Sequence, residues 1–421
     1  MRVIVVGGGP GGSSAARVLA RAGVETVLVE RELVRPKPCG GAIPPLVVEE
    51  FGVPERIIDR KMTITNVFSP SGQIAAVPVG GTKPTDRDYV GMVRREVFDG
   101  WLREQAQEAG ASLLHAGVTG VRVSPESGVT VTYRAKGGTE TTMEADAIIG
   151  ADGAHSQVGR SLGVPKRPQA LAIQERIALP PEKMREWERY AELYIGPEVS
   201  PDFYGWVFPK HDHVSVGVGA CSVSGGEMRN LLTNLKTRLG PRLEGGRVLR
   251  YEAHVLPMKR APHLSYDRAA LVGDAGGLVV GTSGEGIYWA MKSGTRAAEA
   301  MIACQTAPTA ANLRRAYDRR WMREYGSMYR FLDFLQGLCF TSDVRREMFT
   351  ELCRDRDVQR LTFDSYMHKE MARMPWRAQF GLPAKVVASV VRNTLQRRGG
   401  WPVALSSADV LRREGVAVGG D

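Results

Sequence analysis

The first part of the chain alternates short apolar runs with a glycine-rich turn. Residues 3–6 and 24–29 are mainly apolar runs rich in β-branched residues, which is typical of strands buried in a parallel sheet. Residues 13–22, between the two runs, are predicted to form a helix. The order of these segments predicts a strand, a tight turn, a helix and a second strand, which together make a βαβ unit.

Farther along, the pattern changes in steps. Residues 165–260 alternate strand-like segments with turns around one helix near residues 227–239, which predicts an antiparallel sheet. A buried strand at residues 268–272 then leads to a helix at about residues 284–304, and the pattern is helical from residue 310 to about 398. Before residue 151 we expect a helix at residues 95–109 and strands at residues 63–69, 73–79, 112–123, 129–134, 140–145 and 147–150.

These changes of pattern predict a discontinuous nucleotide-binding domain with a substrate domain inserted into it. The predicted divisions are residues 1–165 with 261–305 for the nucleotide-binding domain (including substrate-side strands within 60–95), 166–260 for the antiparallel substrate sheet, 306–398 for a helical C-terminal region and 399–421 for a flexible tail.

The first turn carries glycines at three positions with different needs. Gly7 permits the tight turn, Gly9 lets the backbone approach a pyrophosphate, and Gly12 lets the helix pack closely on the strand. The helix N-terminus then directs its free N–H groups at the phosphates. Glu30, at the end of the second strand, is placed to accept hydrogen bonds from a ribose hydroxyl. The segment predicts a dinucleotide site, whether for FAD or for NAD(P).

A second glycine-rich turn follows the buried strand at residues 268–272. Gly273 and Asp274 end the strand, and a helix begins near residues 284–286. Oriented N–H groups at such a helix N-terminus stabilise negative charge on a ligand, although a simple strand-to-helix turn has the same appearance. There is no second complete GxGxxG, which argues against a separate nicotinamide-binding domain of the glutathione-reductase type.

Composition narrows the class of protein. Of the 421 residues, 43% are apolar, which is ordinary for a globular chain. No apolar run approaches the ~20 residues that span a bilayer, and the first strand begins at residue 2, so we expect no signal peptide and a cytoplasmic location with reduced thiols. The five cysteines form no CxxC pair, which argues against a zinc site.

The formal net charge of +10 is concentrated late in the chain. From residue 310 onward, 20 Lys and Arg stand against 13 Asp and Glu, an excess of +7. This excess fits attraction to a membrane, a diphosphate or an acidic partner, and it fits equally a solvated helical face. No recognition motif accompanies it, so nucleic acid is not an expected partner.

One strand carries an aromatic stripe. In residues 204–210 (YGWVFPK), Tyr204, Trp206 and Phe208 share one face of a predicted strand, and Gly205 leaves the other face thin. Such a stripe makes a flat apolar wall with one phenol and one indole donor. A strand packed into the protein core explains the same composition.

Five segments resemble a known family. Residues 204–210 are similar to the Tyr-x-Trp-x-Phe-Pro motif of the geranylgeranyl reductases, and residues 37–44 (KPCGGAIP) to their cysteine-containing loop. The photosynthetic branch, the geranylgeranyl diphosphate and geranylgeranyl-(bacterio)chlorophyll reductases, is resembled by residues 91–98 (GMVRREVF), 283–288 (SGEGIY) and 360–366 (RLTFDSY). The resemblance covers roughly residues 1–395, with Gly276 and Gly277 where the family more often has Ala-Gly.

The resemblance implies an α/β fold with an aromatic-hydroxylase-like FAD-binding Rossmann domain, an inserted antiparallel-sheet substrate domain and a helical C-terminal region. It implies FAD as cofactor and NADPH as a transient hydride donor. Asp274 would bind the ribityl chain, and Asp152 with Gly153 would lie by FAD and the NADPH path, unless Asp152 is a plain turn residue. The predicted cofactor-binding residues are Gly7, Gly9, Gly12, Glu30, Arg31, Cys39, Gly40, Gly41, Arg95, Asp152, Gly153, Gly273, Asp274, Gly284, Gly286 and Ile287.

The implied reaction saturates three of the four C=C bonds of a geranylgeranyl group, as in (bacterio)chlorophyll biosynthesis. Flavin N5 would deliver hydride to the alkene, and a proton must reach the other carbon. Cys39 and Tyr204 are the predicted catalytic residues, with a purely structural Cys39 as the alternative. Tyr204, Trp206, Phe208 and Lys210 are predicted to bind the substrate, an isoprenoid diphosphate or geranylgeranylated (bacterio)chlorophyll.

Three other activities remain open on the same scaffold: a flavin monooxygenase or epoxidase, an archaeal-type isoprenoid lipid reductase, and a non-catalytic flavin-binding protein. Residues 384–398 form a predicted basic amphipathic helix. It suits peripheral contact with a membrane, and packing onto the protein core explains it as well.

Overall fold

The computed structural model describes residues 1–35, 37–80, 85–359, 367, 369 and 376–399, in two compact units. The family motif at residues 360–366 and the predicted tail from residue 400 lie outside the described residues. The functional division predicted from sequence stays a prediction. The first unit comprises Met1–Cys39, Arg94–Ala170 and Val255–Asp333, and the second comprises Gly40–Val93, Leu171–His254 and Phe334–Asp421.

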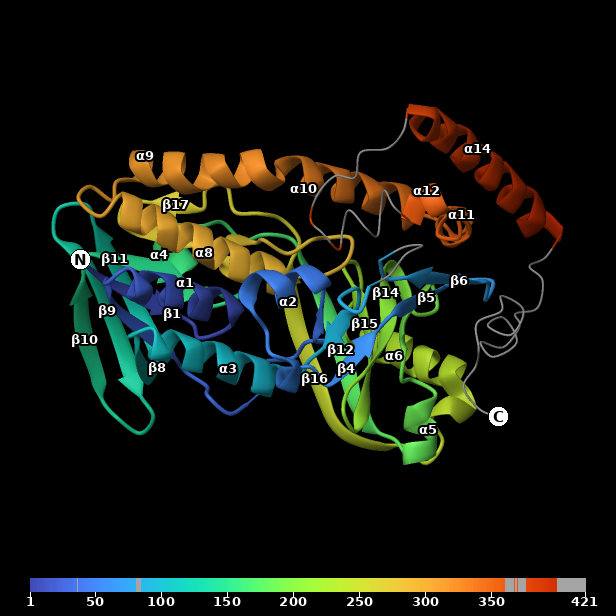
Figure 1. Cartoon of the computed structure of the whole chain (residues 1–421), viewed down its shortest axis with the longest axis horizontal. Helices are drawn as coiled ribbons and strands as arrows, with labels where there is room; N and C mark the ends of the chain where they lie inside the picture. The colour runs from blue at the N-terminus through green and yellow to red at the C-terminus, as the bar shows by residue number, and fades with distance from the viewer. Residues whose placement is uncertain (36, 81–84, 360–366, 368, 370–375, 400–421) are drawn as a thin grey trace. The chain divides into compact units, whose positions relative to one another are not determined.

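The first unit is built on an eight-stranded sheet with the order β10-β9-β8-β2-β1-β11-β18-β17 (Figure 1). The neighbours from β8 to β18 in this order run parallel, as the apolar runs predict, and the strands at either end pair antiparallel. Its strands are β1 (Arg2–Val6), β2 (Glu25–Glu30), β8 (Ser112–Ser124), β9 (Gly128–Ala135), β10 (Glu140–Ala145), β11 (Ala147–Gly150), β17 (Ser265–Tyr266) and β18 (Ala269–Leu271).

Helix α1 (Pro10–Arg21) begins three residues before the predicted start at Ser13. Proline lacks the N–H that a first turn leaves unpaired, so it starts the helix readily, and two glycines follow it within the first turn. Gly11 and Gly294 allow α1 to touch α8 (Ile287–Ala303), because a Cβ at Gly294 would lie 2.1 Å from the Gly11 carbonyl oxygen and one at Gly11 would lie 3.0 Å from the Ala290 carbonyl oxygen. The other helices of this unit are α3 (Arg95–Glu108), α4 (Gln157–Ser161), α7 (Gly273–Gly276), α9 (Ala310–Leu313), the π-helical turn η3 (Arg314–Asp318) and the first part of α10 (Arg319–Cys339).

The second unit holds a seven-stranded sheet with the order β16-β12-β15-β14-β13-β5-β6. Neighbours from β12 to β13 and the pair β5–β6 run antiparallel, as expected. β5, which lies outside the range 165–260 for which an antiparallel sheet is expected, joins this sheet and pairs with β13 in parallel. The strands are β5 (Ile64–Phe68), β6 (Ile74–Pro78), β12 (Gln169–Ala178), β13 (Tyr190–Gly196), β14 (Ser200–Pro209), β15 (His213–Ala220) and β16 (Arg247–Pro257).

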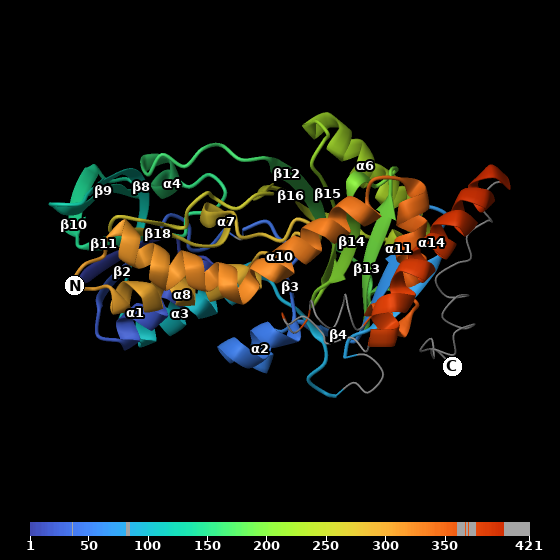
Figure 2. The same cartoon turned by 90° about the horizontal axis from the view of Figure 1, so that it is seen from above.

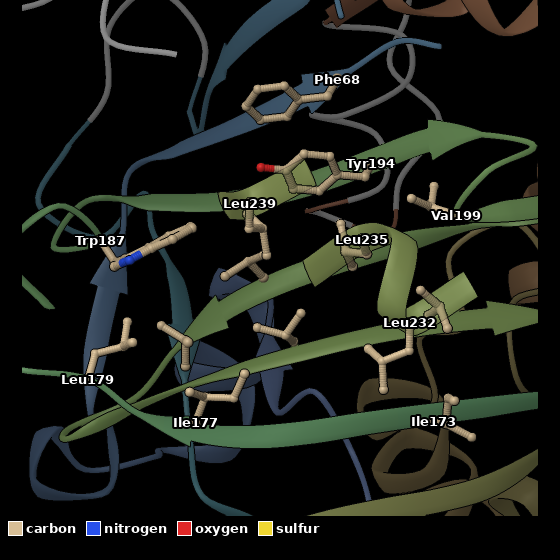
Figure 3. Packing of buried hydrophobic residues seen from close by; sticks show 14 of the residues in the cluster. Phe68, Ile173, Ile177, Leu179, Trp187, Tyr194, Val199, Leu232, Leu235 and Leu239 are labelled. Carbon is tan, nitrogen blue, oxygen red and sulfur yellow. The ribbon is translucent and has the colours of Figure 1, made fainter. Parts of the chain in front are cut away.

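Helix α6 (Gly225–Leu239) covers one face of this sheet (Figure 3). It begins at a capping box in which Ser224 and Glu227 bond reciprocally. Leu232, Leu235 and Leu239 point from the helix onto apolar side chains of the strands. The opposite face of β14 is therefore left for the aromatic stripe.

A small sheet and several short helices complete the second unit (Figure 2). The sheet has the order β3-β7-β4, and β3 begins three residues after Cys39. Among the described residues, no helix is both long and apolar enough to cross a lipid bilayer. The remaining elements are β3 (Ala42–Ile43), β4 (Arg60–Met62), β7 (Val90–Met92), α2 (Pro45–Phe51), η1 (Glu55–Ile57), α5 (Pro181–Arg185), η2 (Gly240–Leu243), α11 (Asp343–Leu352), α12 (Arg356–Gln359) and α14 (Trp376–Gly399).

Candidate cofactor and substrate site

The turn from β1 to α1 brings backbone segments into close contact. Gly7 has a φ of 104°, and a Cβ there would lie 2.3 Å from the Ala151 carbonyl oxygen. A Cβ at Gly12 would lie 1.8 Å from the Gly7 carbonyl oxygen. Gly9, by contrast, faces open space, and it is the N-cap of α1 with no side-chain cap. Packing therefore requires glycine at positions 7 and 12. Gly9 instead leaves room for a phosphate beside the N–H groups at the start of α1.

Glu30 reaches back over this turn from the end of β2. Its Oε2 accepts a hydrogen bond from the Gly8 N–H at 2.5 Å, and its Oε1 accepts one from the Glu32 N–H at 2.9 Å. The carboxylate is thus held beside the glycines, where a ribose hydroxyl can share it. Arg31 follows Glu30 with an exposed side chain.

Arg103 contacts this turn from another element, and the sequence analysis did not predict it. It lies on α3 and donates from Nη1 to the Gly8 carbonyl oxygen at 3.3 Å and from Nη2 to the Leu33 carbonyl oxygen at 2.9 Å. The signal was present, because Arg95, Asp99 and Arg103 recur every fourth residue on the helix face that also buries apolar side chains. Charged residues on a buried helix face point to a site or an ion-pair network.

Arg95 and Asp99 form such a pair at the start of α3. The guanidinium donates from Nε and Nη2 to the two carboxylate oxygens at 2.8 and 2.7 Å, and the side chains are 3% and 11% exposed. Arg95 also hydrogen-bonds the side chain of Cys39. Burial alone lowers the pKa of Arg95, but Asp99 and Cys39 raise it above its usual value, so the arginine stays charged. The predicted cofactor arginine is thus a direct neighbour of the predicted catalytic cysteine.

The second glycine-rich turn surrounds Asp274. Gly273 has a φ of 54° and donates its N–H to the Ser293 hydroxyl at 3.0 Å, which ties the turn to α8. The Asp274 carboxylate accepts a hydrogen bond from Lys37 Nζ at 2.7 Å. Lys37 belongs to the cysteine-containing loop, so the two predicted motifs meet within the first unit.

Helix α8 follows α7 after the connection of residues 277–286. Gly284 has a φ of 62°, Gly286 is the N-cap without a side-chain cap, and Ile287 is the first helical residue, three positions later than expected. A helix N-terminus attracts negative charge.

Asp152 uses its carboxylate within its own segment. Oδ1 accepts from the Ser156 hydroxyl, and Oδ2 accepts from the N–H groups of Gln157 and Val158 at 2.6 and 3.1 Å. Burial raises the pKa of Asp152, and these hydrogen bonds oppose that rise. These hydrogen bonds are those expected if Asp152 is a plain turn residue. A contact of Asp152 or of Gly153, whose φ is 81°, with the cofactor stays a prediction.

In the second unit, the two glycines after Cys39 lie against β14. A Cβ at Gly40 would lie 2.8 Å from the Phe208 ring, and one at Gly41 (φ 67°) would lie 2.2 Å from the Val93 carbonyl oxygen. Lys210, only 2% exposed, donates from Nζ to the Gly41 carbonyl oxygen at 3.2 Å. The loop needs both glycines because side chains of β14 and the backbone before α3 leave no room for larger residues.

The aromatic stripe has the predicted alternation. The Tyr204 ring is stacked on Phe203 at 4.5 Å and lies edge-on to Trp206 at 6.2 Å, and Trp206 lies 6.3 Å from Phe208. The Trp206 Nε1 is buried and finds no hydrogen-bond partner among the described residues. It lies 3.4 Å from the Cβ position of Gly40, so an indole donor faces the loop at its glycine.

The structure thus gathers the predicted residues into two groups, each within one unit. The first unit holds Gly7, Gly9, Gly12, Glu30, Arg31, Cys39, Arg95, Asp152, Gly153, Gly273, Asp274, Gly284, Gly286 and Ile287, and the second holds Gly40, Gly41, Tyr204, Trp206, Phe208 and Lys210.

Residues 1–176 match the family model described as an FAD binding domain. The chain is 43% identical over 403 residues to "Geranylgeranyl diphosphate reductase" of Synechocystis sp., an alignment that covers 93% of this chain and 98% of the relative. The chain belongs to the geranylgeranyl diphosphate reductase family. A "Digeranylgeranylglycerophospholipid reductase" of Methanocaldococcus jannaschii is a more distant member of the comparison, at 30% identity over 77% of this chain and 82% of the relative.

The fold of this geranylgeranyl diphosphate reductase family member is also found in solved structures. A geranylgeranyl bacteriochlorophyll reductase-like protein from Thermoplasma acidophilum superposes with a TM-score of 0.71 at 21% identity, covering 99% of each chain. The predicted α/β fold with an aromatic-hydroxylase-like FAD-binding domain is confirmed. The family member is an FAD-dependent reductase. The open space at Gly9 and the uncapped termini of α1 and α8 fit that cofactor.

Proposed function

We propose that the protein uses NADPH to saturate three C=C bonds of a geranylgeranyl group, giving phytyl for (bacterio)chlorophyll biosynthesis. One observation carries the proposal beyond the family name. Phe208 and Trp206 of the aromatic stripe lie against Gly40, the residue that follows the predicted catalytic cysteine in the chain, so the loop that carries the thiol continues onto an apolar wall. An isolated alkene offers little for polar recognition, so a shaped apolar wall is the recognition chemistry that it requires.

In this proposal FAD, when bound, supplies hydride for the alkene. The chain's own residues provide orientation, a proton and a dry surface. Trp206 and Phe208 exclude water from the alkene. The N-terminus of α8 would stabilise negative charge on the bound flavin. Cys39 Sγ or Tyr204 Oη holds the proton for the second carbon. Lys210, buried on the Gly41 carbonyl, contributes to substrate binding by shaping the loop.

Anaerobic turnover with NADPH tests the activity. We expect purified enzyme without oxygen to convert both geranylgeranyl diphosphate and a geranylgeranylated (bacterio)chlorophyll, or only one of them, to products resolved by degree of saturation. Turnover that requires oxygen would establish the monooxygenase alternative instead. Bound FAD that NADPH never reduces would indicate a non-catalytic flavoprotein, and turnover only of a digeranylgeranylglycerol phospholipid would indicate an archaeal-type lipid reductase.

Replacement of Cys39 by serine tests its role in proton transfer. A hydroxyl is a much weaker acid than a thiol, so we expect kcat to fall by about 100-fold or more, within the range that general acids contribute. Reduction of the flavin by NADPH, measured by stopped-flow absorbance, should remain unchanged. Tyr204→Phe, measured in parallel, identifies the donor if it alone loses activity. Full activity in the cysteine variant would leave Cys39 with a structural role.

We also propose that α14 attaches the protein to a lipid surface. Ser389 Oγ and Asn393 Nδ2 donate to Glu351 of α11 at 2.5 and 3.1 Å, so polar residues of the helix face the protein. Its apolar stripe, Val387, Val391 and Leu395, is 61%, 53% and 61% exposed. The stripe and the positive charge of the C-terminal stretch suit an anionic bilayer.

Vesicle flotation tests this attachment. The unmodified protein is expected to float with vesicles of phosphatidylcholine and phosphatidylglycerol, and Val391→Glu with Leu395→Glu to reduce the floating fraction about tenfold, because two charges would enter the lipid face. Val248→Glu is the matched control, since Val248 is 47% exposed on β16 and lies outside the stripe. Unmodified protein that stays with the soluble fraction would refute the attachment.

A further inference from the structure

Lys37 and Asp274 join two motifs that are far apart in the sequence. Lys37 Nζ lies 2.7 Å from Asp274 Oδ2, and the two side chains are 35% and 9% exposed. Most exposed ion pairs contribute little to stability. Here the carboxylate is almost buried. The Lys37 ammonium therefore offsets the free-energy cost of removing the Asp274 charge from water.

Lys37 is also close to Cys39 along the chain. Only Pro38 separates them. Because proline fixes its own φ, a backbone displacement at Lys37 also displaces Cys39. At the far end of this short segment, Arg95 hydrogen-bonds the Cys39 side chain. The segment is therefore anchored at both ends: Lys37 binds Asp274 at one end, and Arg95 of α3 binds Cys39 at the other.

Lys37 binds one oxygen of the carboxylate and so sets its rotation. The other oxygen, Oδ1, lies 3.5 Å from the Cβ position of Gly286, the N-cap of α8. A carboxylate offers about four acceptor positions, so Lys37 can share Asp274 with other donors. The orientation of Asp274 toward the start of α8 thus depends on a residue of the cysteine loop.

We propose that Lys37 is a positioning residue that couples the cofactor site to Cys39. It holds the Asp274 carboxylate in the orientation that FAD requires, and through the same ion pair it anchors the segment that carries the thiol. The inference rests on the proposed function in placing FAD at Asp274 and the reacting alkene near Cys39. Because FAD and Lys37 share one carboxylate, occupancy of the cofactor site and accessibility of the thiol become linked, and the linkage acts equally in both directions.

Two readouts on the full-length protein test the coupling without substrate. The first is the dissociation constant of FAD, titrated into apoprotein. The second is the rate of Cys39 alkylation by iodoacetamide, with and without FAD, followed by peptide mass spectrometry. Cys221 is exposed and serves as the internal reference in every sample. The variants are Lys37→Met and Lys37→Arg, and the control is Lys61→Met, which breaks an ion pair with Glu55 at the surface.

We expect Lys37→Met to weaken FAD binding about tenfold and to speed alkylation of Cys39 about fivefold relative to Cys221, within the usual range of coupling between sites. FAD should protect Cys39 in the unmodified protein and no longer do so in Lys37→Met. Lys37→Arg keeps a cation at this position and should restore both readouts, and Lys61→Met should leave both unchanged.

A Lys37→Met protein with unchanged FAD affinity, or with unchanged alkylation and protection of Cys39, overturns the inference. If Lys37→Met is unfolded, the buried Cys339 and Cys353 are alkylated faster. The same two readouts are then measured on Lys37→Gln. Failure of the proposed function is seen separately. A wild-type enzyme that never reduces a geranylgeranyl group, yet shows these effects of Lys37, loses the substrate assignment alone.

Discussion

A Gly12→Ala protein is expected to lose FAD and much of its stability. The new Cβ would lie 1.8 Å from the Gly7 carbonyl oxygen and 3.0 Å from the Ala151 side chain, so α1 would have to move away from β1 and β11. Overpacking a tight interior costs ~1–3 kcal/mol, and more where backbone must shift, so we expect unfolding free energy to fall by about 3 kcal/mol. Urea unfolding, followed by circular dichroism and flavin fluorescence, measures both losses.

Two other glycines serve as controls for this variant. Gly100 lies within α3, and a Cβ there meets nothing within 4 Å, so Gly100→Ala is expected to keep FAD and to gain about 0.5–1 kcal/mol of helix stability. Gly9→Ala also adds its Cβ to open space, so the apoprotein should remain as stable as before. FAD affinity should nevertheless fall in Gly9→Ala, because the pyrophosphate is expected there. Gly12→Ala protein with normal FAD affinity would contradict the packing argument.

Asp99→Ala is expected to destabilise the protein at least as much as Gly12→Ala. It leaves the Arg95 guanidinium, which is 3% exposed, without the carboxylate that accepts its two hydrogen bonds. Breaking a buried ion pair from one side costs ~3–5 kcal/mol, because the remaining charge stays desolvated. Arg95 would then also hold Cys39 less firmly, so activity should fall even where the protein remains folded. Urea unfolding and steady-state kinetics of the same preparation measure the two effects.

The double variant Arg95→Met with Asp99→Leu isolates the unpaired charge as the cause. It removes both charges, so it should be more stable than Asp99→Ala although it changes more atoms. Glu55→Ala breaks the exposed pair with Lys61 and is expected to leave the unfolding curve in place. If Asp99→Ala proved as stable as Glu55→Ala, the guanidinium would have found another partner and the argument would be wrong.

The two sheets show how far the pattern of apolar residues could predict the fold. Continuous apolar runs at residues 3–6 and 147–150 correctly predicted the central parallel strands β1 and β11. The same kind of pattern did not reveal that β5 pairs in parallel with β13, because side-chain alternation reports which face of a strand is buried and not which strand lies beside it. The start of α1 was misplaced for a local reason, since Gly11 and Gly12 are poor helix formers but are required there for close packing.

The candidate site was predictable where the chemistry is carried by backbone. Glycines at Gly7 and Gly12 are imposed by contacts within one short motif, so spacing alone indicates them. Arg103 and the ion pair of Lys37 with Asp274 depend on segments that meet only after folding. Lys210 illustrates the same limit, because its position after an aromatic strand gave no sign that its ammonium would be buried on the Gly41 carbonyl.

The place of β18 in the first sheet has a consequence for synthesis of the protein on the ribosome. β18 pairs with β11, yet it comprises Ala269–Leu271, which emerge long after Ala147–Gly150. A nascent chain that ends before Ala269 therefore exposes β11 as an open edge, and open edges recruit other chains. Chaperones that shield such edges, or slow translation before this stretch, are expected to decide the yield of active protein in a foreign host.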